Sequence, residues 1–530
     1  MNCPFFRRTS GSFIPERIIK RNGSILIVTA FLFLAFGALA LGLIFLSQVY
    51  LKIGGYEKHS RLLEYAAENG IKEGLHHLVS AIAKSPQPSV ITEEAFAGLK
   101  ADALGSGSLL AANATGLRFP IELEAQEERM IWQSQIEYQL DGVADQEGFI
   151  LARLSLPIQS QGHIRGLAFR RSSSLDVKAE VLAGHVPLST IPFLLDKNLS
   201  AEEQAAFPQE GGITFLPSTG GLLPPQLSFG NEEFIPPEAT PLLEKALDIE
   251  IFRPQDISTA KLRSVLGLEE SQDPVPEGVY LIRNDMGLGG VYVQGDVEEL
   301  VAAIEGDYQV VSFRMASGVW VLKYSPAQSR TIFSSPEGEE LFDLIPLGVI
   351  IIDGRVLSLG GGQVDEGGAV RLVTDQEIPS LLPGIRLTLV ASDKITITSH
   401  LVQQGITWRD GIPYLKSEQA QVVLFSTGHD LWSEEGRDGG IVISGDAPEG
   451  LKVQAGLTSG GAGIILEGEN KSLQLMGSIQ TTEYSFSGRR LELTPWVSRP
   501  AGNGPPLLGP RTRQAVLFIS RFDAAAWKEY

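Results

Sequence analysis

The chain has 530 residues and a formal net charge of −20, and its composition includes 57 glycines, 5 methionines and one cysteine, Cys3. This length exceeds that of a single compact domain and predicts two or three units. The acidic balance argues against nucleic acid and anionic membrane surfaces as partners, and a single cysteine excludes a disulfide within the chain. Abundant glycine with little methionine is typical of turn-rich β structure and not of a helical bundle.

A basic leader, residues 1–23, precedes an uncharged apolar segment that runs from residue 24 to residue 51. A helix that spans the bilayer needs about 20 apolar residues. We therefore predict a transmembrane helix over residues 24–50. The leader carries five Lys or Arg residues and one Glu, and positively charged flanks stay in the cytoplasm. Residues 52–530 are therefore expected on the opposite side of the membrane.

A cleaved secretion signal is the alternative for this segment. Its apolar core would be about 7–15 residues long and would be followed by a small-residue cleavage site. Ala38-Leu39-Ala40 fits such a site and would give a mature chain that starts at Leu41. The apolar sequence continues beyond Ala40 as far as Leu46, whereas a cleaved signal normally gives way to polar sequence, so a retained helix is favoured.

The junction between leader and helix resembles the class III signal of type IV pilins and type II secretion pseudopilins, because basic residues are followed by Gly23 and then by the small residue Ser24, which opens a long apolar helix. The resemblance implies that a prepilin peptidase cuts after Gly23 on the cytoplasmic side and that Ser24 becomes the N-methylated first residue. Glycine lacks a Cβ and so permits the close approach that a peptidase cleft requires. The implied location is the bacterial inner membrane, in single-pass topology, with the C-terminal region periplasmic or extracellular.

A second similarity lies beyond the membrane segment. Residues 65–70, YAAENG, are similar to the segment that follows the membrane helix in PilX-type minor pilins. Major pilins carry a Glu at the fifth mature position, where this chain has Val28, and PilX-type and K-type minor subunits share that departure. A buried carboxylate is costly unless it is paired, so Val28 favours a subunit at a filament tip or one that primes assembly; an ordinary lipid-facing residue is the alternative. The implied partners are other minor and major pilins and the inner-membrane assembly platform.

Four further regions are predicted after the membrane segment. Residues 51–85 have apolar side chains at helical spacing and end before Pro86 and Pro88, which predicts an amphipathic helix. The resemblance to pilins implies that this helix is part of the stalk. Residues 86–185 combine a short helical segment with alternating strands and predict a small α+β unit. Residues 186–275 are rich in Pro, Gly and Glu and are interpreted as an extended linker with short helices. Residues 276–530 predict a β-rich C-terminal domain.

Short β segments separated by Gly or Asp recur through residues 276–530. They predict a β-solenoid or parallel β-helix, with a β-sandwich as the alternative because alternating strands and turns give a similar pattern. Residues 516–519, VLFI, are expected to form a closing strand. The fold class is therefore expected to be α+β to mainly β.

The sequence contains no nucleophile-elbow, P-loop, zinc-protease or Cys-x-x-Cys motif. His76 and His77 are adjacent and so face different sides of a helix, which argues against a shared metal ion. Asp141, Asp145 and Glu147 resemble a sparse calcium loop but lack its regular ligand positions. We therefore predict no catalytic residue, no metal and no cofactor.

Polar residues also occur between the predicted strands of residues 276–530. Aspartates follow several of the predicted strands, and two histidines lie among them: Asp296, Asp353, Asp393, Asp446, His400 and His429. Carboxylates that line a sugar-processing groove are one interpretation, and aspartates that stabilise turns are the favoured one. The histidines are interpreted as surface or turn residues.

Three functional hypotheses follow. The leading one is a non-enzymatic minor pilin or pseudopilin that primes assembly, or presents its large β-rich domain, at the tip of a type IV pilus or type II secretion-type filament. The alternative is a membrane-anchored or secreted β-helix protein that binds or degrades glycans. The third is a single-pass anchored structural protein without processing at Gly23.

Overall fold

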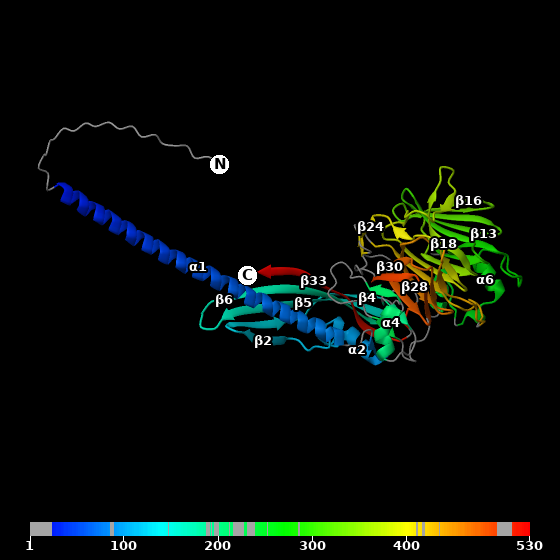
Figure 1. Cartoon of the computed structure of the whole chain (residues 1–530). Coiled ribbons are helices and arrows are strands. Elements are labelled where there is room, and N and C mark those ends of the chain that lie inside the picture. The colour runs from blue at the N-terminus through cyan, green and yellow to red at the C-terminus, as the bar shows by residue number, and fades with distance from the viewer. Residues whose placement is uncertain are drawn as a thin grey trace, which may run out of the picture.

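In the computed structural model, a long helix leads into a sheet-bearing unit and then into a larger β-rich unit at the far end of the molecule (Figure 1). The structure describes residues 24–529 except 85–88, 147, 187–190, 192, 196–200, 211, 216–226, 230–238, 252, 285–286, 410–411, 416–418, 434, 496–510 and 513. The apolar N-terminal helix and the mostly β C-terminal region agree with the expected fold class.

Helix α1 (Ser24–Lys84) is one continuous helix of 61 residues. Its length is about 90 Å at a rise of 1.5 Å per residue, and Gly54 and Gly55 do not interrupt it. The first half of α1 is exposed, whereas its second half buries one apolar stripe at helical spacing. The most deeply buried residues of the stripe are Leu63, Ala66, Ala67, Ile71, Leu78 and Ile82.

A seven-stranded antiparallel sheet packs against that stripe. Its order is β1 (Ser89–Val90), β33 (Val516–Glu529), β6 (Arg170–Gly184), β5 (Phe149–Ile164), β3 (Met130–Ile136) and β2 (Ile121–Glu127), and β4 (Gln139–Gln146) pairs with β5. Helix α1 lies on β3, β5 and β6. Helices α2 (Glu93–Ala103) and α3 (Ser108–Thr115) complete the same core. We call α1, these two helices and this sheet the helix–sheet unit.

Two glycines set how closely α1 approaches the sheet. A Cβ on Gly162 of β5 would lie 2.6 Å from the backbone nitrogen of Ala67 and 2.7 Å from the carbonyl oxygen of Leu63. A Cβ on Gly70 of α1 would lie 2.1 Å from Oγ of Ser160. The two backbone distances at Gly162 are too short for any other residue, so the helix and the sheet are in backbone contact there, and at Gly70 the neighbouring serine side chains would have to move.

The β-rich unit consists of two large sheets. The first has the order β10 (Gly278–Asn284), β11 (Gly287–Gln294), β17 (Val349–Asp353), β21 (Arg386–Ala391), β26 (Gln421–Ser426), β28 (Leu451–Ser459), β30 (Ser472–Thr481), β32 (Arg490–Pro495) and β8 (Ile213–Phe215). The second has the order β16 (Gly338–Phe342), β15 (Arg330–Ser335), β14 (Gly318–Ser325), β13 (Tyr308–Met315), β12 (Glu299–Glu305), β18 (Val356–Val364), β22 (Ile395–Ile397), β27 (Ile441–Ile443), β29 (Ile464–Glu467) and β31 (Tyr484–Ser487).

Pairing is parallel from β11 to β32 in the first sheet and from β12 to β31 in the second. Except for short excursions, the chain visits the two sheets alternately, so each circuit adds one strand to each. Leucine and isoleucine side chains from both sheets fill the interior, for example Leu389 and Leu424 from the first and Ile397 and Ile443 from the second.

Smaller strands extend this frame. β19 (Val370–Leu372) pairs with β18, β20 (Pro379–Leu381) pairs with β23 (Val402–Gln403), and β24 (Ile406–Arg409) forms a hairpin with β25 (Ile412–Leu415). Strands β12 to β16 form an antiparallel meander at the end of the second sheet.

Residues 186–275 were interpreted as an extended linker with short helices; short helices are present, but the described segments are packed and not extended. β7 (Phe193–Leu195) pairs with β30 and with β9 (Leu227–Phe229), and β8 pairs with β32. Helix α5 (Thr240–Leu247) packs Leu243 and Ala246 against the outer face of the first sheet beside Tyr292. The other helices here are α4 (Ala201–Glu210), the 3-10 turn Pro254–Asp256 and α6 (Thr259–Val265). Proline and glycine indicate turns in this region, but the apolar residues between those turns pack against the β-rich unit.

The predicted C-terminal boundary is also corrected. The strand expected at residues 516–519 exists, but it is longer, Val516–Glu529, and it pairs with β6 of the helix–sheet unit. Val516 lies opposite Gly184, and the Thr512 N–H donates to the carbonyl oxygen of Val186 at 2.9 Å. The β-rich unit is therefore an insertion between two neighbouring strands of the antiparallel sheet.

This arrangement predicts that residues 187–511 can be replaced by a linker of about four Gly or Ser residues. Because Val186 and Thr512 are already hydrogen-bonded, the helix–sheet unit should remain folded in detergent and resist limited proteolysis. Its thermal midpoint should fall modestly, since Ile191 and Leu194 leave a cluster with Phe149. A chain that stops after Val186 is the control and should be degraded, because it lacks β33. Equal sensitivity of both variants would contradict the insertion.

Candidate functional site

The first half of α1 exposes a continuous apolar surface. The most apolar window of α1, within residues 29–82, has a mean hydropathy of 2.5 and none of it is buried, so α1 is long and apolar enough to cross a membrane. Its exposed large side chains include Phe31, Phe33, Leu34, Leu41, Phe45, Tyr50 and Leu51. Water disfavours such a surface by roughly 25 cal/mol per Å², so this half of the helix requires an apolar environment.

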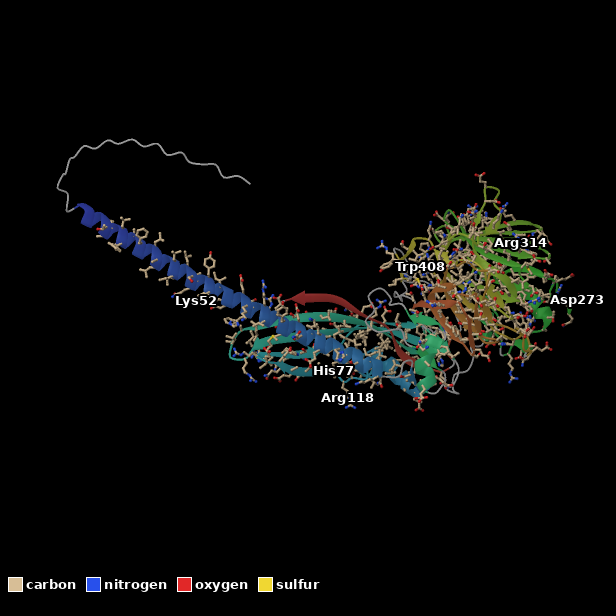
Figure 2. All side chains as sticks on the ribbon, viewed as in Figure 1. Lys52, His77, Arg118, Asp273, Arg314 and Trp408 are labelled. Carbon is tan, nitrogen blue, oxygen red and sulfur yellow. The ribbon has the colours of Figure 1, made fainter. Side chains whose placement is uncertain are left out.

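The helix becomes attached to the sheet just beyond this surface (Figure 2). The rings of Tyr56 and Phe169 meet edge to face with centroids 6.4 Å apart, and Arg171 lies 4.0 Å from Glu64. Further along, the Trp132 indole N–H donates to Glu73, and the Ser134 hydroxyl donates to the carbonyl oxygen of Gly70 at 2.8 Å. The exposed and the attached halves therefore follow each other without a break in the helix.

The predicted processing residues lie at the start of this surface. Gly23 is outside the described residues, Ser24 is the first residue of α1, and Val28 lies one turn further along the same helix. Their roles in cleavage and assembly stay predictions.

The histidines and acidic residues considered as metal ligands are dispersed. Within the described part of the chain, no group of three or more His, Cys, Asp or Glu side chains could hold a metal ion. His76 and His77 are exposed on α1. Asp141 forms an ion pair with Lys178 at 2.6 Å, and Asp145 pairs with Lys100, while Glu147 lies outside the described residues.

Three of the four strand-end aspartates lie at the same turn in three successive circuits of the β-rich unit. Asp296, Asp353 and Asp393 lie where the chain leaves the first sheet, whereas Asp446 follows β27 in the second sheet. Asp296 accepts hydrogen bonds from the Arg355 backbone N–H at 2.9 Å and from its guanidinium at 2.6 Å. These bonds lower the pKa of Asp296 against the opposing effect of partial burial. The structure therefore brings three aspartates together and separates the fourth.

Asp353 is the buried member of this turn, with 8% of its surface exposed. Its carboxylate lies 3.2 Å from the Arg437 guanidinium, which also pairs with Asp430. Ser392 and Gln294 donate to Asp353 at 3.2 and 3.3 Å. Burial raises the pKa of Asp353, although Arg437 opposes that shift.

The loop that carries Asp430 and Arg437 is fastened to the first sheet by these contacts. Its Trp432 indole N–H donates to the Tyr292 hydroxyl at 3.1 Å. Hydrogen bonds from the Trp432 backbone N–H and from Arg437 hold the pKa of Asp430 below its usual range despite partial burial. With both oxygens of Asp353 already engaged, the cluster acts as a clasp that holds the loop, and not as an acid–base pair.

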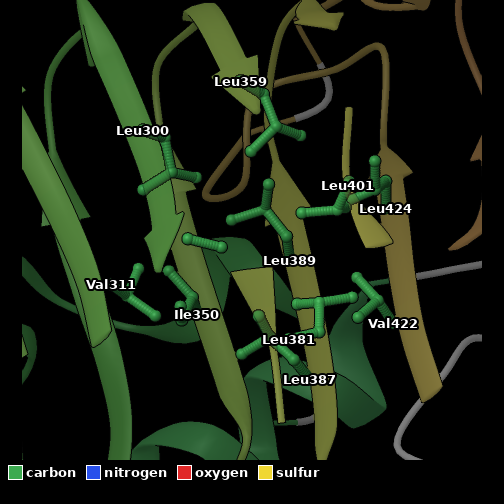
Figure 3. Close-up of a pocket in the computed structure, with 11 residues that line it drawn as sticks. Leu300, Val311, Ile350, Leu359, Leu381, Leu387, Leu389, Leu401, Val422 and Leu424 are labelled. Atoms are coloured by element: carbon green, nitrogen blue, oxygen red, sulfur yellow. The ribbon is translucent and has the colours of Figure 1, made fainter. Parts of the chain in front are cut away.

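A cavity of about 20 Å³ lies between the two sheets and is enclosed by aliphatic side chains from several strands (Figure 3). Leu300, Leu359, Leu389 and Leu424 are among the residues that line it. A cavity of this size holds about one water, but an apolar lining keeps it dry. It is a packing defect and not a ligand site.

Sequence reasoning missed two arginine sites, one at the partly exposed Arg437 and one at the buried Arg489. Arg437 was overlooked because its partners are up to 84 residues away along the chain. Arg489 is fully buried and donates to the carbonyl oxygens of Glu467, Pro448, Ser472, Ser444 and Ala447. Burial lowers the pKa of Arg489. No local pattern marks such a residue, because its partners are backbone atoms brought together only by folding.

Comparison of the chain with protein-family models, with curated proteins and with solved structures finds no match.

The clasp predicts a pH-dependent stability defect in Arg437→Met. Removing the cation leaves Asp353 buried without its partner, which should cost about 3 kcal/mol at pH 7. The pKa of Asp353 is already raised, and it should rise further in this variant. Because the pKa of Asp353 is raised in the folded state, its protonation stabilises the fold at low pH. This contribution to the free energy of unfolding is lost as the pH rises through that pKa. The difference in thermal midpoint between variant and wild type should grow from pH 4 to pH 7.

Arg355→Met is the matched control, because Arg355 pairs with Asp296 while half of its side chain is exposed. Such a pair contributes about 0–1 kcal/mol. The clasp is refuted if Arg437→Met costs no more than Arg355→Met at pH 7, or if its cost is the same at both pH values.

Proposed function

We propose that this chain is a minor-pilin-like subunit that is anchored in a membrane by the first half of α1 and presents its β-rich unit away from that membrane. The observation that carries the proposal is the division of one helix into two halves. One half exposes an apolar surface to its surroundings, and the other half is packed on an antiparallel sheet. An anchor alone needs no rigid continuation, whereas a filament subunit needs its membrane helix joined stiffly to its folded part.

We further propose that the β-rich unit is a β-solenoid. Support comes from the in-register parallel pairing of successive circuits, for example Leu473 beside Leu451 and Leu491 beside Leu473. Each circuit places an equivalent apolar residue in the interior, as repeat architectures require. A sandwich of the immunoglobulin type would pair its neighbouring strands antiparallel, which makes that alternative the weaker one.

The proposed assembly route starts with processing. Prepilin peptidase would cleave after Gly23, Ser24 would become the mature N-terminus, and Val28 would occupy the position at which major pilins carry Glu. The chain would then sit in the bacterial inner membrane with its leader in the cytoplasm and its C-terminal region outside it. Other minor and major pilins and the assembly platform would be its partners.

A position at the filament tip is supported by the bulk and placement of the inserted unit. It lies at the opposite end of the molecule from the exposed half of α1 (Figure 1). Subunits stacked along a shaft would have to accommodate that unit at every repeat, whereas one copy at an end has free space beyond it. The glycan-degrading alternative gains no support from the strand-end aspartates, since Asp296 and Asp353 are both paired with arginine.

The processing step is tested by the N-terminus of the protein isolated from membranes of cells that contain a prepilin peptidase. Mass spectrometry should find N-methylated Ser24 in the wild type. Gly23→Val should yield an uncleaved precursor that is 23 residues longer, because a side chain blocks close approach at the cleavage site. Gly37→Val, within α1 and with open space around Gly37, is the control and should be processed normally.

Two results would refute this step. A mature chain that starts at Leu41 would identify a cleaved secretion signal. An intact leader in the wild type would leave a plain membrane anchor.

A further inference from the structure

A third side of the β-rich unit carries a row of polar side chains. It is formed by β20, β23 and the first residues of β28, β30 and β32, because Leu401 bridges in parallel to Val453 and the later strands continue in register. One polar residue occupies the equivalent position beside or on each successive strand: His400, Lys452, Gln474 and Glu492. We call these four residues the polar row.

Three residues of the row face outward, whereas the fourth, His400, is buried with 7% of its surface exposed. Side chains alternate between the two faces of a strand, and the residues that flank the row are fully buried in the interior, namely Leu451, Val453, Leu473, Leu475, Leu491 and Leu493. Lys452, Gln474 and Glu492 are partly exposed. Neighbouring strands lie about 4.8 Å apart, so the row presents a new polar group at that interval along the unit.

Contacts within the row fix its donors and acceptors. The Lys452 backbone N–H donates to Nδ1 of His400 at 3.1 Å, which places the proton of the neutral ring on Nε2. Burial lowers the pKa of His400, so the ring is neutral at pH 7. The Gln474 amide donates to Glu492 at 3.0 Å, and the Lys452 ammonium pairs with Glu377.

A hairpin places an indole ring beside the row. Trp408 is carried by β24 (Figure 2). Its ring centroid lies 5.8 Å from Lys452 Nζ. On the same hairpin, the Arg409 guanidinium lies 5.6 Å from the ring centroid of Tyr414, which is 41% exposed. Trp408 and Tyr414 lie on opposite faces of the hairpin, so the indole ring of Trp408 is the aromatic surface beside the row.

Hydrogen-bonding capacity at this place is left unused. Trp408 Nε1 and Gln474 Oε1 are buried without a hydrogen-bond partner. Gln419, on the segment that returns from the hairpin, is 7% exposed, and neither of its amide atoms has a partner. A buried polar group left unpaired costs about 1–3 kcal/mol, so a small side-chain adjustment that lets a ligand bond to Trp408 or Gln474 would be favourable.

We propose that the polar row and Trp408 form a binding site for an uncharged oligosaccharide chain. The site offers both donors and acceptors at regular intervals, which suits a polymer that carries hydroxyl groups along its length. The indole ring offers an apolar face for the C–H surface of a sugar. Glu377 and Glu492 disfavour an acidic polymer, and the single ammonium of Lys452 is already paired.

This assignment rests on the proposed function only in that the β-rich unit is the part presented outside the membrane. Binding is a property of the folded chain and does not depend on cleavage after Gly23. An unprocessed Gly23→Val protein should therefore bind the same oligosaccharide, so failure of one proposal is distinguishable from failure of the other.

The test is isothermal titration of the full chain in detergent with cellohexaose, maltohexaose and chitohexaose. At least one should bind with Kd of about 1 mM or tighter. Lys452→Met keeps the aliphatic stem of the side chain and removes its donors, and it should weaken binding about tenfold. Trp408→Phe keeps an aromatic ring but removes the indole N–H and part of the ring surface, and should weaken binding about threefold.

Lys323→Met is the matched control. Lys323 also pairs with a glutamate, Glu305 at 2.7 Å, and its side chain is 19% exposed compared with 21% for Lys452. It lies on the meander, away from the row, and its substitution should leave binding unchanged. The proposal is overturned if none of the three oligosaccharides binds, if Lys452→Met and Trp408→Phe both bind as tightly as wild type, or if Lys323→Met weakens binding as much as Lys452→Met.

Discussion

The backbone contact between α1 and the antiparallel sheet is the constraint on which the rest of the molecule depends. Gly70 and Gly162 allow the helix to lie directly on β5, and Ser134 and Glu73 bind across the same seam. Without this contact the exposed apolar half of α1 would be a flexible tether. With it, the direction of the helix determines the direction of the sheet, and through β6 and β33 the placement of everything inserted between them.

The sequence predicted the elements that depend on short-range patterns. An uncharged apolar run and a helical stripe predicted α1, and recurrent short strands predicted a β-rich C-terminal region. It did not predict where distant segments meet. Composition made residues 186–275 look like a linker, although Phe193 and Leu243 are buried in the β-rich unit. Likewise, no local signal could show that β33 pairs with β6 across more than 300 residues.

Candidate sites show the same division. Gly23 and Ser24 were proposed from a local motif, and the strand-end aspartates were interpreted as turn residues from their positions alone. By contrast, Arg437, Arg489 and the polar row arise only when successive circuits are stacked, because their partners lie on neighbouring strands. In a fold of stacked parallel strands, residues that are neighbours on the surface come from successive circuits and are far apart in the sequence. A motif search along the sequence therefore does not detect such a surface.

The shared exit of β6 and β33 determines how the molecule carries load. Because Gly184 and Val516 are paired neighbours, a pull on the β-rich unit draws both strands in the same direction and leaves their mutual hydrogen bonds nearly unloaded. The force passes instead into β5, which is paired with β6 over fifteen successive residues from Phe149 to His163. Those hydrogen bonds are loaded together in shear and do not open one at a time. A pulling force on the β-rich unit therefore reaches α1 along the direction in which the sheet resists force most strongly.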